Sequence, residues 1–398
     1  MSRYLLLVTS LIWLVDTSYA QDPSFSQFFA NRVYLNPAYA GFDPGMQVAI
    51  NYRDQWFGLP DGDLTGVNRG YRTLNLTGEW QLPCFLGLDN FNLGTAVTVF
   101  RDEAGAAPLR TQGFSWAFSY EQPLLRSTDR KLKRLDLRVG MQTALMQHRL
   151  KGNFFVYSDQ LDPVIGVIDP MTVVDLNSRF FPNLNAGLLL RGYAEAWSGR
   201  KETLFSLGLN FANVNEPNNA LDGVAEQAVL PMRMTLHGGF TYRITRFKGV
   251  SSPIYLAPQF RWDTQLGGKL NLQTIGTYVL ARGYYAGFFV QYSFSDRNYL
   301  PPASVAAALL PRNTSSLILN AGMDIKSLLD NGVPWRKRDS GMVLGLTYDL
   351  NLGSLNGQQT LGVLELSLRM AIPTSKKGKG CGEISQFELY KGDCPVRF

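Results

Sequence analysis

The sequence is poor in charged residues and has no long apolar run after its first few residues. Asp, Glu, Lys and Arg make up only 18% of the 398 residues, and the Lys- and Glu-rich faces typical of surface helices are missing. From residue 21 onward, no apolar stretch approaches the roughly 18 to 20 residues that a membrane-spanning helix needs. These absences exclude a helical membrane protein, but they leave a membrane-spanning β-barrel open.

The side chains that carry most enzyme and metal chemistry are also scarce. The two histidines, His148 and His237, fall on separate expected strands and have no metal-ligand spacing. No pair of strand carboxylates stands out as an acid–base couple. The Gly-rich run 283–287 lacks the strand-to-helix context and the Lys of a phosphate-binding loop. The sequence therefore indicates no enzyme, no cofactor and no bound metal.

The basic residues do not form a patch, although the net charge is +6. They are scattered singly along the expected strands, whereas nucleic-acid-binding proteins gather Lys and Arg on one face or along one helix. We therefore expect no nucleic-acid partner.

Residues 1–20 have the pattern of a secretory signal peptide. Arg3 precedes a short apolar run, and residues 18–20 have the small-x-small form of a cleavage site, which makes Gln21 the expected first mature residue. Export to an oxidising compartment would permit a disulfide between Cys381 and Cys394 and leave the third cysteine free. Spacing alone does not decide whether that bridge forms.

What the sequence does contain is a repeated alternation of apolar and polar residues in segments of about ten residues, the length of a tilted transmembrane strand. In one of them, Phe114, Trp116 and Phe118 alternate with Ser115 and Ala117. Such segments lie at about 46–53, 71–82, 92–101, 110–122, 133–148, 183–193, 203–212, 232–245, 253–264, 269–282, 283–295, 316–326, 341–352 and 359–371. We therefore predict an all-β, transmembrane outer-membrane β-barrel of about 14 antiparallel strands.

Three observations favour this barrel over a soluble β-sandwich, which also has alternating strands. Strand charges of both signs, such as Arg53, Glu79 and Glu365, lie opposite the aliphatic residues. Aromatic residues recur near strand ends, as in interfacial girdles. The longest connections are odd-numbered (54–70, 149–182, 213–231 and 296–314) and most even-numbered ones are short, although 327–340 is an exception. Outer-membrane barrels show this asymmetry, with the long connections extracellular.

The domain organisation follows from this count. Residues 1–20 are the expected signal peptide, 21–45 a periplasmic N-terminal segment, 46–371 the transmembrane barrel and 372–398 a periplasmic C-terminal tail. An even number of strands places both ends of the mature chain on the periplasmic side, where they are available to periplasmic partners.

The opening stretch carries a family resemblance. QDPSFSQFFANRVYLNPAYAGF, followed by the strand VAINYRDQW, resembles the N-terminal signature of the PorP/SprF family of outer-membrane proteins, which is associated with the type IX secretion system and gliding motility. The matching residues are Gln21, Asp22, Pro23, Phe25, Ser26, Gln27, Phe28, Asn31, Leu35, Asn36, Pro37, Ala38, Gly41, Arg53 and Trp56. GLTYDLNL at 345–352, residues 364–369 and the CPVRF ending resemble closing strands and a tail of this family.

The resemblance implies an outer-membrane accessory that assists secretion and cell-surface anchoring of large substrates, such as gliding adhesins with a C-terminal sorting domain. The implied partners are outer-membrane lipid, the C-terminal domain of the secreted substrate and periplasmic components of the type IX system. A porin-like diffusion channel for small solutes is the alternative, in which the mixed charges line open water.

The signature residues themselves have two interpretations. As a plug or docking segment, the candidates are Asp22, Pro23, Phe25, Gln27, Phe28, Asn36, Pro37, Gly41, Arg53 and Trp56. In the alternative, structural interpretation, Pro23, Pro37 and Gly41 fix a turn under the barrel, and the Phe side chains pack into its periplasmic mouth.

Overall fold

The computed structural model describes most of the expected strands and part of the N-terminal stretch. The described residues are 24–43, 46–57, 71–82, 93–105, 109–127, 131–150, 161–162, 166–167, 175–195, 202–221, 228–244, 254–265, 271–281, 283–293, 314–325, 341–352 and 361–372. The expected signal peptide, Asp22, Pro23, all three cysteines and residues 373–398 lie outside these ranges.

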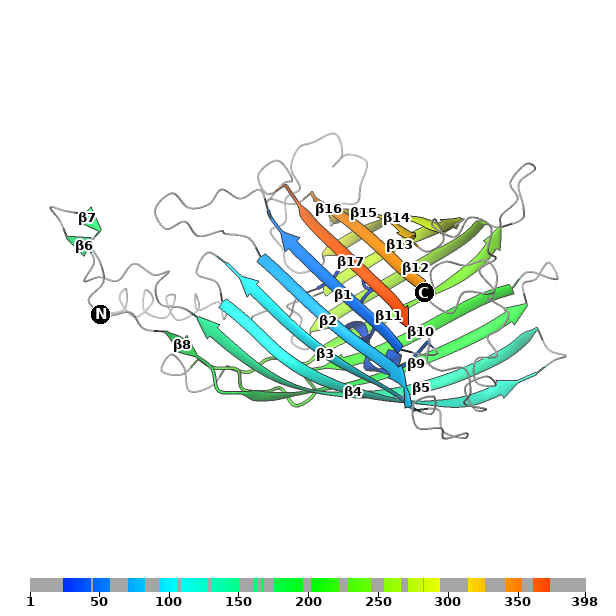
Figure 1. Cartoon of the computed structure of the whole chain (residues 1–398), viewed down its shortest axis with the longest axis horizontal. Coiled ribbons are helices and arrows are strands. Elements are labelled where there is room, and N and C mark those ends of the chain that lie inside the picture. The colour runs from blue at the N-terminus through cyan, green and yellow to red at the C-terminus, as the bar shows by residue number, and fades with distance from the viewer. Residues whose placement is uncertain are drawn as a thin grey trace, which may run out of the picture.

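Within the described ranges, the chain forms a closed barrel of 14 antiparallel strands (Figure 1). They are β1 (Met46–Gln55), β2 (Tyr71–Gln81), β3 (Leu93–Ala104), β4 (Leu109–Arg126), β5 (Leu132–Leu150), β9 (Phe181–Glu195), β10 (Glu202–Ala212), β11 (Arg233–Ile244), β12 (Ile254–Gln265), β13 (Asn271–Ala281), β14 (Tyr284–Ser293), β15 (Thr314–Asp324), β16 (Gly341–Asn351) and β17 (Val363–Ile372). Each strand pairs with the next in this order, and β17 returns to pair with β1. The predicted fold is confirmed, and all the predicted segments coincide with these strands to within a few residues.

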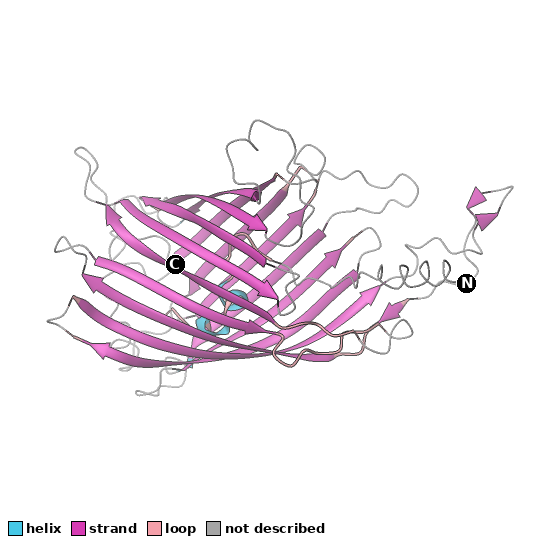
Figure 2. Ribbon diagram, turned by 180° about the vertical axis from the view of Figure 1, so that it is seen from behind, coloured by secondary structure: helices cyan, strands magenta, loops and turns pink. Residues whose placement is uncertain are grey.

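The remaining elements are short. Strands β6 (Leu161–Asp162) and β7 (Gly166–Val167) pair with each other, and β8 (Leu176–Asn177) pairs with the end of β5. The helix α2 (Arg32–Leu35) and the 3-10 helix η1 (Pro37–Tyr39) are enclosed by the strands (Figure 2). No helix among the described residues is long and apolar enough to cross a membrane.

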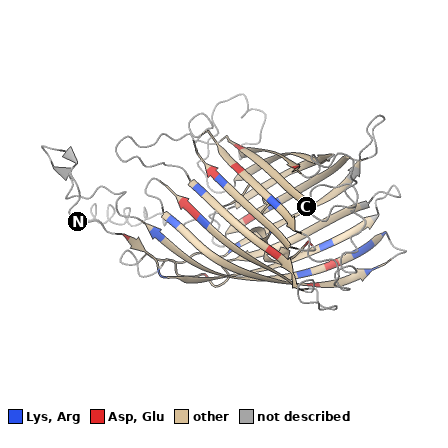
Figure 3. Cartoon of the chain, viewed as in Figure 1, with Lys and Arg blue, Asp and Glu red and all other residues tan. Residues whose placement is uncertain are grey.

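The alternation along each strand separates an outer, apolar face from an inner, polar one. On β4, Trp116 and Phe118 are exposed on the outside of the barrel, whereas Ser115 and Ser119 are buried inside it. Charges of both signs are spaced along the strands (Figure 3), and Arg138, like other predicted inward-facing charges, is buried. This is the arrangement of a barrel in lipid, where a charge on the outer face near the midplane costs about 2 to 4 kcal/mol.

Candidate functional site

Residues 24–43, here called the inner segment, lie inside the barrel and are almost entirely buried. Local sequence explains the shape of this segment. Asn36 precedes η1, its side-chain Oδ1 accepts a hydrogen bond from the N–H of Ala38 at 2.9 Å, and Pro37 occupies the first helical position. Gly41 has a φ of +58°, a conformation that favours glycine, so the chain turns there towards β1.

Three glycines in the barrel wall allow the inner segment to lie directly against the strands. A Cβ on Gly94 of β3 would lie 2.1 Å from the carbonyl oxygen of Ala40. A Cβ on Gly140 of β5 would lie 2.2 Å from the nitrogen of Ala38, and one on Gly187 of β9 would lie 2.0 Å from Oδ1 of Asn36. No side chain fits at these three positions while the segment stays where it is.

The side chain of Asn36 joins the inner segment to three strands. Its Nδ2 donates to the carbonyl oxygens of Leu188 on β9 at 3.0 Å and Leu209 on β10 at 3.3 Å, and lies 3.1 Å from Nε2 of His237 on β11. His237 also lies against the ring of Tyr39, with 5.7 Å between centroids. Burial raises the pKa of the Tyr39 hydroxyl above its usual 10.0, so the phenol stays neutral at physiological pH. The contacts of His237 with Asn36 and Tyr39 give this histidine a structural role.

A first ion cluster consists of Ser26, Arg53 on β1, Asp349 on β16 and Glu365 on β17. The carboxylate of Glu365 accepts hydrogen bonds from the backbone N–H groups of Ser26 at 2.8 Å and Gln27 at 2.9 Å. Arg53 forms an ion pair with Glu365 and donates to Oγ of Ser26 at 3.1 Å, while the Ser26 hydroxyl donates to Asp349. The cluster therefore holds the start of the segment to the first and last strands.

A second ion cluster holds the other end of the inner segment. Arg32 forms ion pairs with Asp43 at 2.7 Å and with Glu79 of β2 at 3.3 Å. Arg369 of β17 pairs with the same Asp43 and lies 4.0 Å from Glu79. Two cations and two anions thus balance each other where water is largely excluded, which limits the cost of burying each charge.

Further contacts of the inner segment are cationic and aromatic. Arg138 of β5 donates to the carbonyl oxygens of Ala38 at 2.9 Å and Ala40 at 2.8 Å. The guanidinium carbon of Arg191 of β9 lies 4.1 Å from the ring centroid of Phe42, a cation–π contact. Edge-to-face ring contacts join Phe28 to Phe289 and Phe29 to Tyr278 and Tyr285.

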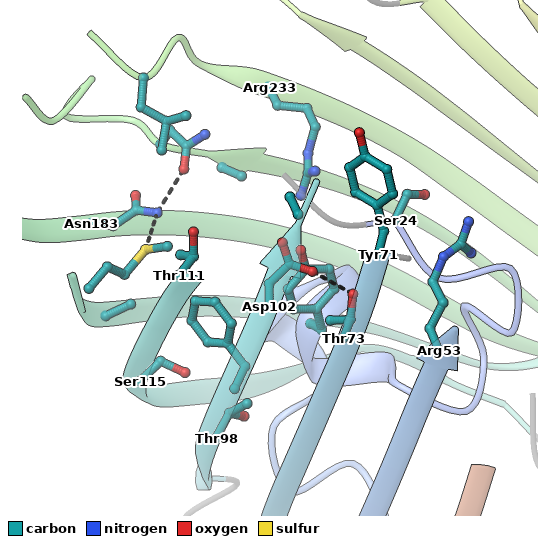
Figure 4. A pocket seen from close by; sticks show the side chains of 18 of the residues that line it. Ser24, Arg53, Tyr71, Thr73, Thr98, Asp102, Thr111, Ser115, Asn183 and Arg233 are labelled. Atoms are coloured by element: carbon teal, nitrogen blue, oxygen red, sulfur yellow. Dashed lines mark hydrogen bonds between the residues drawn. The ribbon is translucent and has the colours of Figure 1, made fainter. Parts of the chain in front are cut away.

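A cavity of about 650 Å³ lies beside the inner segment (Figure 4). It is lined by Ser24 and Ser26, by residues at the ends of β1, β3, β5 and β10, and by residues at the starts of β2, β4, β9 and β11. This end of the barrel carries the four longest predicted connections. Within the cavity wall, Asn183 donates to Asn213 at 2.7 Å and Asn185 donates to Gln142 at 2.7 Å. The lining is mostly uncharged and polar.

The structure brings most of the sequence-predicted site residues together. Phe25, Gln27, Phe28, Asn36, Pro37 and Gly41 belong to the inner segment, Arg53 to the first ion cluster, and Trp56 lines the cavity just after β1. Asp22, Pro23, Cys381 and Cys394 lie outside the described residues.

Sequence reasoning missed Arg32 and Asp43 as site residues, and it missed the partners of Glu365 and Arg369. Opposite charges within one short signature were a signal for the pair Arg32 and Asp43, which lie eleven positions apart. No local signal pointed to Glu365, because Ser26, to which it bonds, is 339 positions away.

Comparisons with known proteins give one family match and distant structural likenesses. The family described as type IX secretion system membrane protein PorP/SprF matches residues 17–370. No curated protein matches the chain. Among solved structures, CdiB from Acinetobacter baumannii is 12% identical with a TM-score of 0.41, over 83% of this chain and 60% of that one. The Acinetobacter baumannii outer membrane protein Omp33 is 7% identical with a TM-score of 0.34, over 84% and 99%. The transport unit of the autotransporter AIDA-I from Escherichia coli is 9% identical with a TM-score of 0.35, over 86% and 98%.

Proposed function

Because the chain belongs to the PorP/SprF family of type IX secretion system membrane proteins, we propose that it is an outer-membrane accessory that assists the secretion and cell-surface anchoring of large substrates. Gliding adhesins with a C-terminal sorting domain are the proposed substrates. The observation that carries this proposal over a diffusion channel is the inner segment. Its buried contacts reach strands on every side of the barrel, including β1, β5, β9 and β17, so it acts as a plug.

The orientation of the barrel follows from its two unequal ends. We place the cavity and the long connections at the cell surface, and the start of β1 and the C-terminal tail, 372–398, in the periplasm. In this orientation the cavity and connections 54–70 and 149–182 contact the C-terminal domain of a substrate. The opposite end contacts periplasmic components of the secretion system. Export by a signal peptide at residues 1–20, and a disulfide between Cys381 and Cys394, are parts of the same proposal. No step of it requires catalysis or a cofactor.

Purification from native membranes tests the proposal directly. We expect gentle extraction of the tagged chain to retain a secreted substrate or a component of the type IX system, identified by mass spectrometry. A barrel of similar size without the family signature, extracted from the same membranes, is the control. Failure to recover either class of protein above that control would contradict the secretion role.

Conductance in planar bilayers tests the plug separately. We expect the intact chain to give no steady conductance, because the inner segment blocks the lumen between the cavity and the start of β1, and a chain lacking residues 22–39 to give open-channel currents. Steady conductance of the intact chain, together with no secreted partner, would favour the porin-like alternative.

A further inference from the structure

The barrel closes at a seam where the last strand, β17, meets the first, β1. The register runs from Met46 opposite Ile372 to Gln55 opposite Val363. In a hairpin, the turn fixes which residues face each other. No turn joins β1 to β17, because the rest of the barrel separates them in sequence. Something other than a turn must therefore select this register.

The lipid-facing residues of the seam do not select it. On β17 these residues are Leu364, Leu366, Leu368 and Met370, and on β1 they are Met46, Val48, Ile50 and Tyr52. Because side chains alternate with a period of two, a shift of β17 by two residues would still place aliphatic side chains opposite largely aliphatic ones. Such a shift would change the stagger of the barrel, which is linked to the tilt of its strands and its width.

The inward-facing residues of β17 do distinguish one register from the next. Glu365, Ser367 and Arg369 follow one another on the inner face, and each bonds to the inner segment. Glu365 accepts from the N–H groups of Ser26 and Gln27, at 2.8 and 2.9 Å. The Ser367 hydroxyl donates to the side chain of Gln27, and Arg369 pairs with Asp43.

The inner segment is itself positioned relative to β1. Asp43 precedes Met46 by three residues, and Ser26 accepts a hydrogen bond from Arg53 of β1 at 3.1 Å. A two-residue shift would move Glu365 by about 7 Å from the N–H groups that it accepts from. It would leave Glu365 buried with fewer partners and would separate Arg369 from Asp43, and both changes are unfavourable inside a barrel.

We propose that the inner segment has a second function, independent of secretion: it selects the register in which β17 closes on β1. The ion pair between Arg53 and Glu365, which lie opposite each other on β1 and β17, also favours this register. The segment adds the backbone donors of Ser26 and Gln27 for Glu365, the side-chain oxygen of Gln27 for Ser367 and the carboxylate of Asp43 for Arg369, which together match three successive inward positions of the closing strand.

Disulfide trapping across the seam tests this proposal. In a chain with Cys84→Ser, Cys381→Ser and Cys394→Ser, Ile50→Cys is combined with Leu368→Cys, its partner in the structure, or with Leu366→Cys or Met370→Cys, which report shifts of two residues. With the inner segment intact, we expect a disulfide only between positions 50 and 368. In a chain lacking residues 22–43, we expect trapping of a shifted pair to rise at least tenfold.

A gentler variant guards against failure of the shortened chain to form a barrel. Asp43→Asn combined with Glu365→Gln keeps the side-chain shapes but removes both charges, and we expect it to increase trapping of the shifted pairs. Glu103→Gln on the outer face of β3, two strands from β1, also removes a paired carboxylate but lies away from the inner segment, so as a control it should leave the seam unchanged. If the double variant, and the shortened chain wherever it forms a barrel, cross-link only between positions 50 and 368, the proposal is overturned.

A second control uses a pair of strands whose register a short connection sets. Leu190→Cys and Leu207→Cys face each other on β9 and β10. We expect this pair to form its disulfide equally with and without the inner segment, so that a change at the seam reports closure and not a general loosening of the barrel.

Discussion

At the scale of single residues, the wall glycines explain how a barrel of this size holds a segment of its own chain. Glycine weakens a strand because it has no side chain to pack and because it is flexible in the unfolded chain. At Gly94, Gly140 and Gly187 the inner segment occupies the space that a side chain would take. The weakness of the strand is offset by the contacts of the segment.

Gly140→Ala is expected to displace the inner segment and to lower the stability of the barrel. The new Cβ would lie 2.2 Å from the nitrogen of Ala38 and 2.4 Å from the carbonyl carbon of Pro37, and these backbone atoms must move. The midpoint of the heat-induced shift in gel mobility should fall. Gly78→Ala is the control, since its Cβ would meet only the Trp80 ring at 3.9 Å. Equal midpoints for the two variants would contradict this account.

Asn36→Ala is expected to lower the free energy of unfolding by about 1 to 3 kcal/mol, because it leaves buried groups without their hydrogen-bond partner. The groups affected are the N–H of Ala38 and the carbonyl oxygens of Leu188 and Leu209. Urea unfolding in lipid vesicles measures the change. Gln55→Ala, at the cavity, is the comparison, and a loss no larger than that of Gln55→Ala would show that Asn36 is dispensable.

At the scale of elements, the sequence predicted the strands but not the path of the inner segment. Each barrel strand repeats apolar and polar residues over about ten positions, and period-two alternation is a local signal. The strands β6, β7 and β8 have two residues each, too few for such a signal. The inner segment has no single period, because its contacts surround it on all sides. Its position depends on Glu365, Arg138 and other residues far away in sequence.

The outer face of β4 offers a test at this scale. Phe118 is 44% exposed near the middle of the strand, on the face that we expect to meet lipid. Phe118→Arg should destabilise the barrel by about 2 to 4 kcal/mol, because it places a charge near the bilayer midplane. The free energy of unfolding from vesicles measures this, with Phe118→Leu as the control. Tolerance of the arginine would mean that this face does not meet lipid.

At the scale of the whole molecule, the two ends of the barrel differ. The cavity lies at the end where the strands lead into the long connections, and the second ion cluster of the inner segment lies near the start of β1. The two ends of the barrel therefore differ in the side chains that they carry. At the cavity end the lining is mostly neutral amides, hydroxyls and aromatic rings, whereas the second ion cluster lies towards the other end.

Labelling of intact cells with a membrane-impermeant maleimide tests this asymmetry. In a cysteine-free chain, Thr111→Cys in the cavity should react from outside the cell. Ala96→Cys, buried on the inner face near the start of β3 and packed against Val33 of the inner segment, should react only when residues 22–39 are deleted. The reverse pattern, with Ala96→Cys labelled in the intact chain, would contradict both the proposed orientation and the proposed closure of the lumen.

The wall glycines also have a consequence for how such chains diverge. A strand that must leave room for a neighbouring backbone is under a steric constraint that ends when the neighbour is lost. A lineage that lost the inner segment would be free to replace Gly94, Gly140 and Gly187, and selection for stability would favour larger side chains there. The residues at these three positions in a related sequence would then indicate whether its barrel encloses a segment, even where the segment itself has diverged beyond recognition.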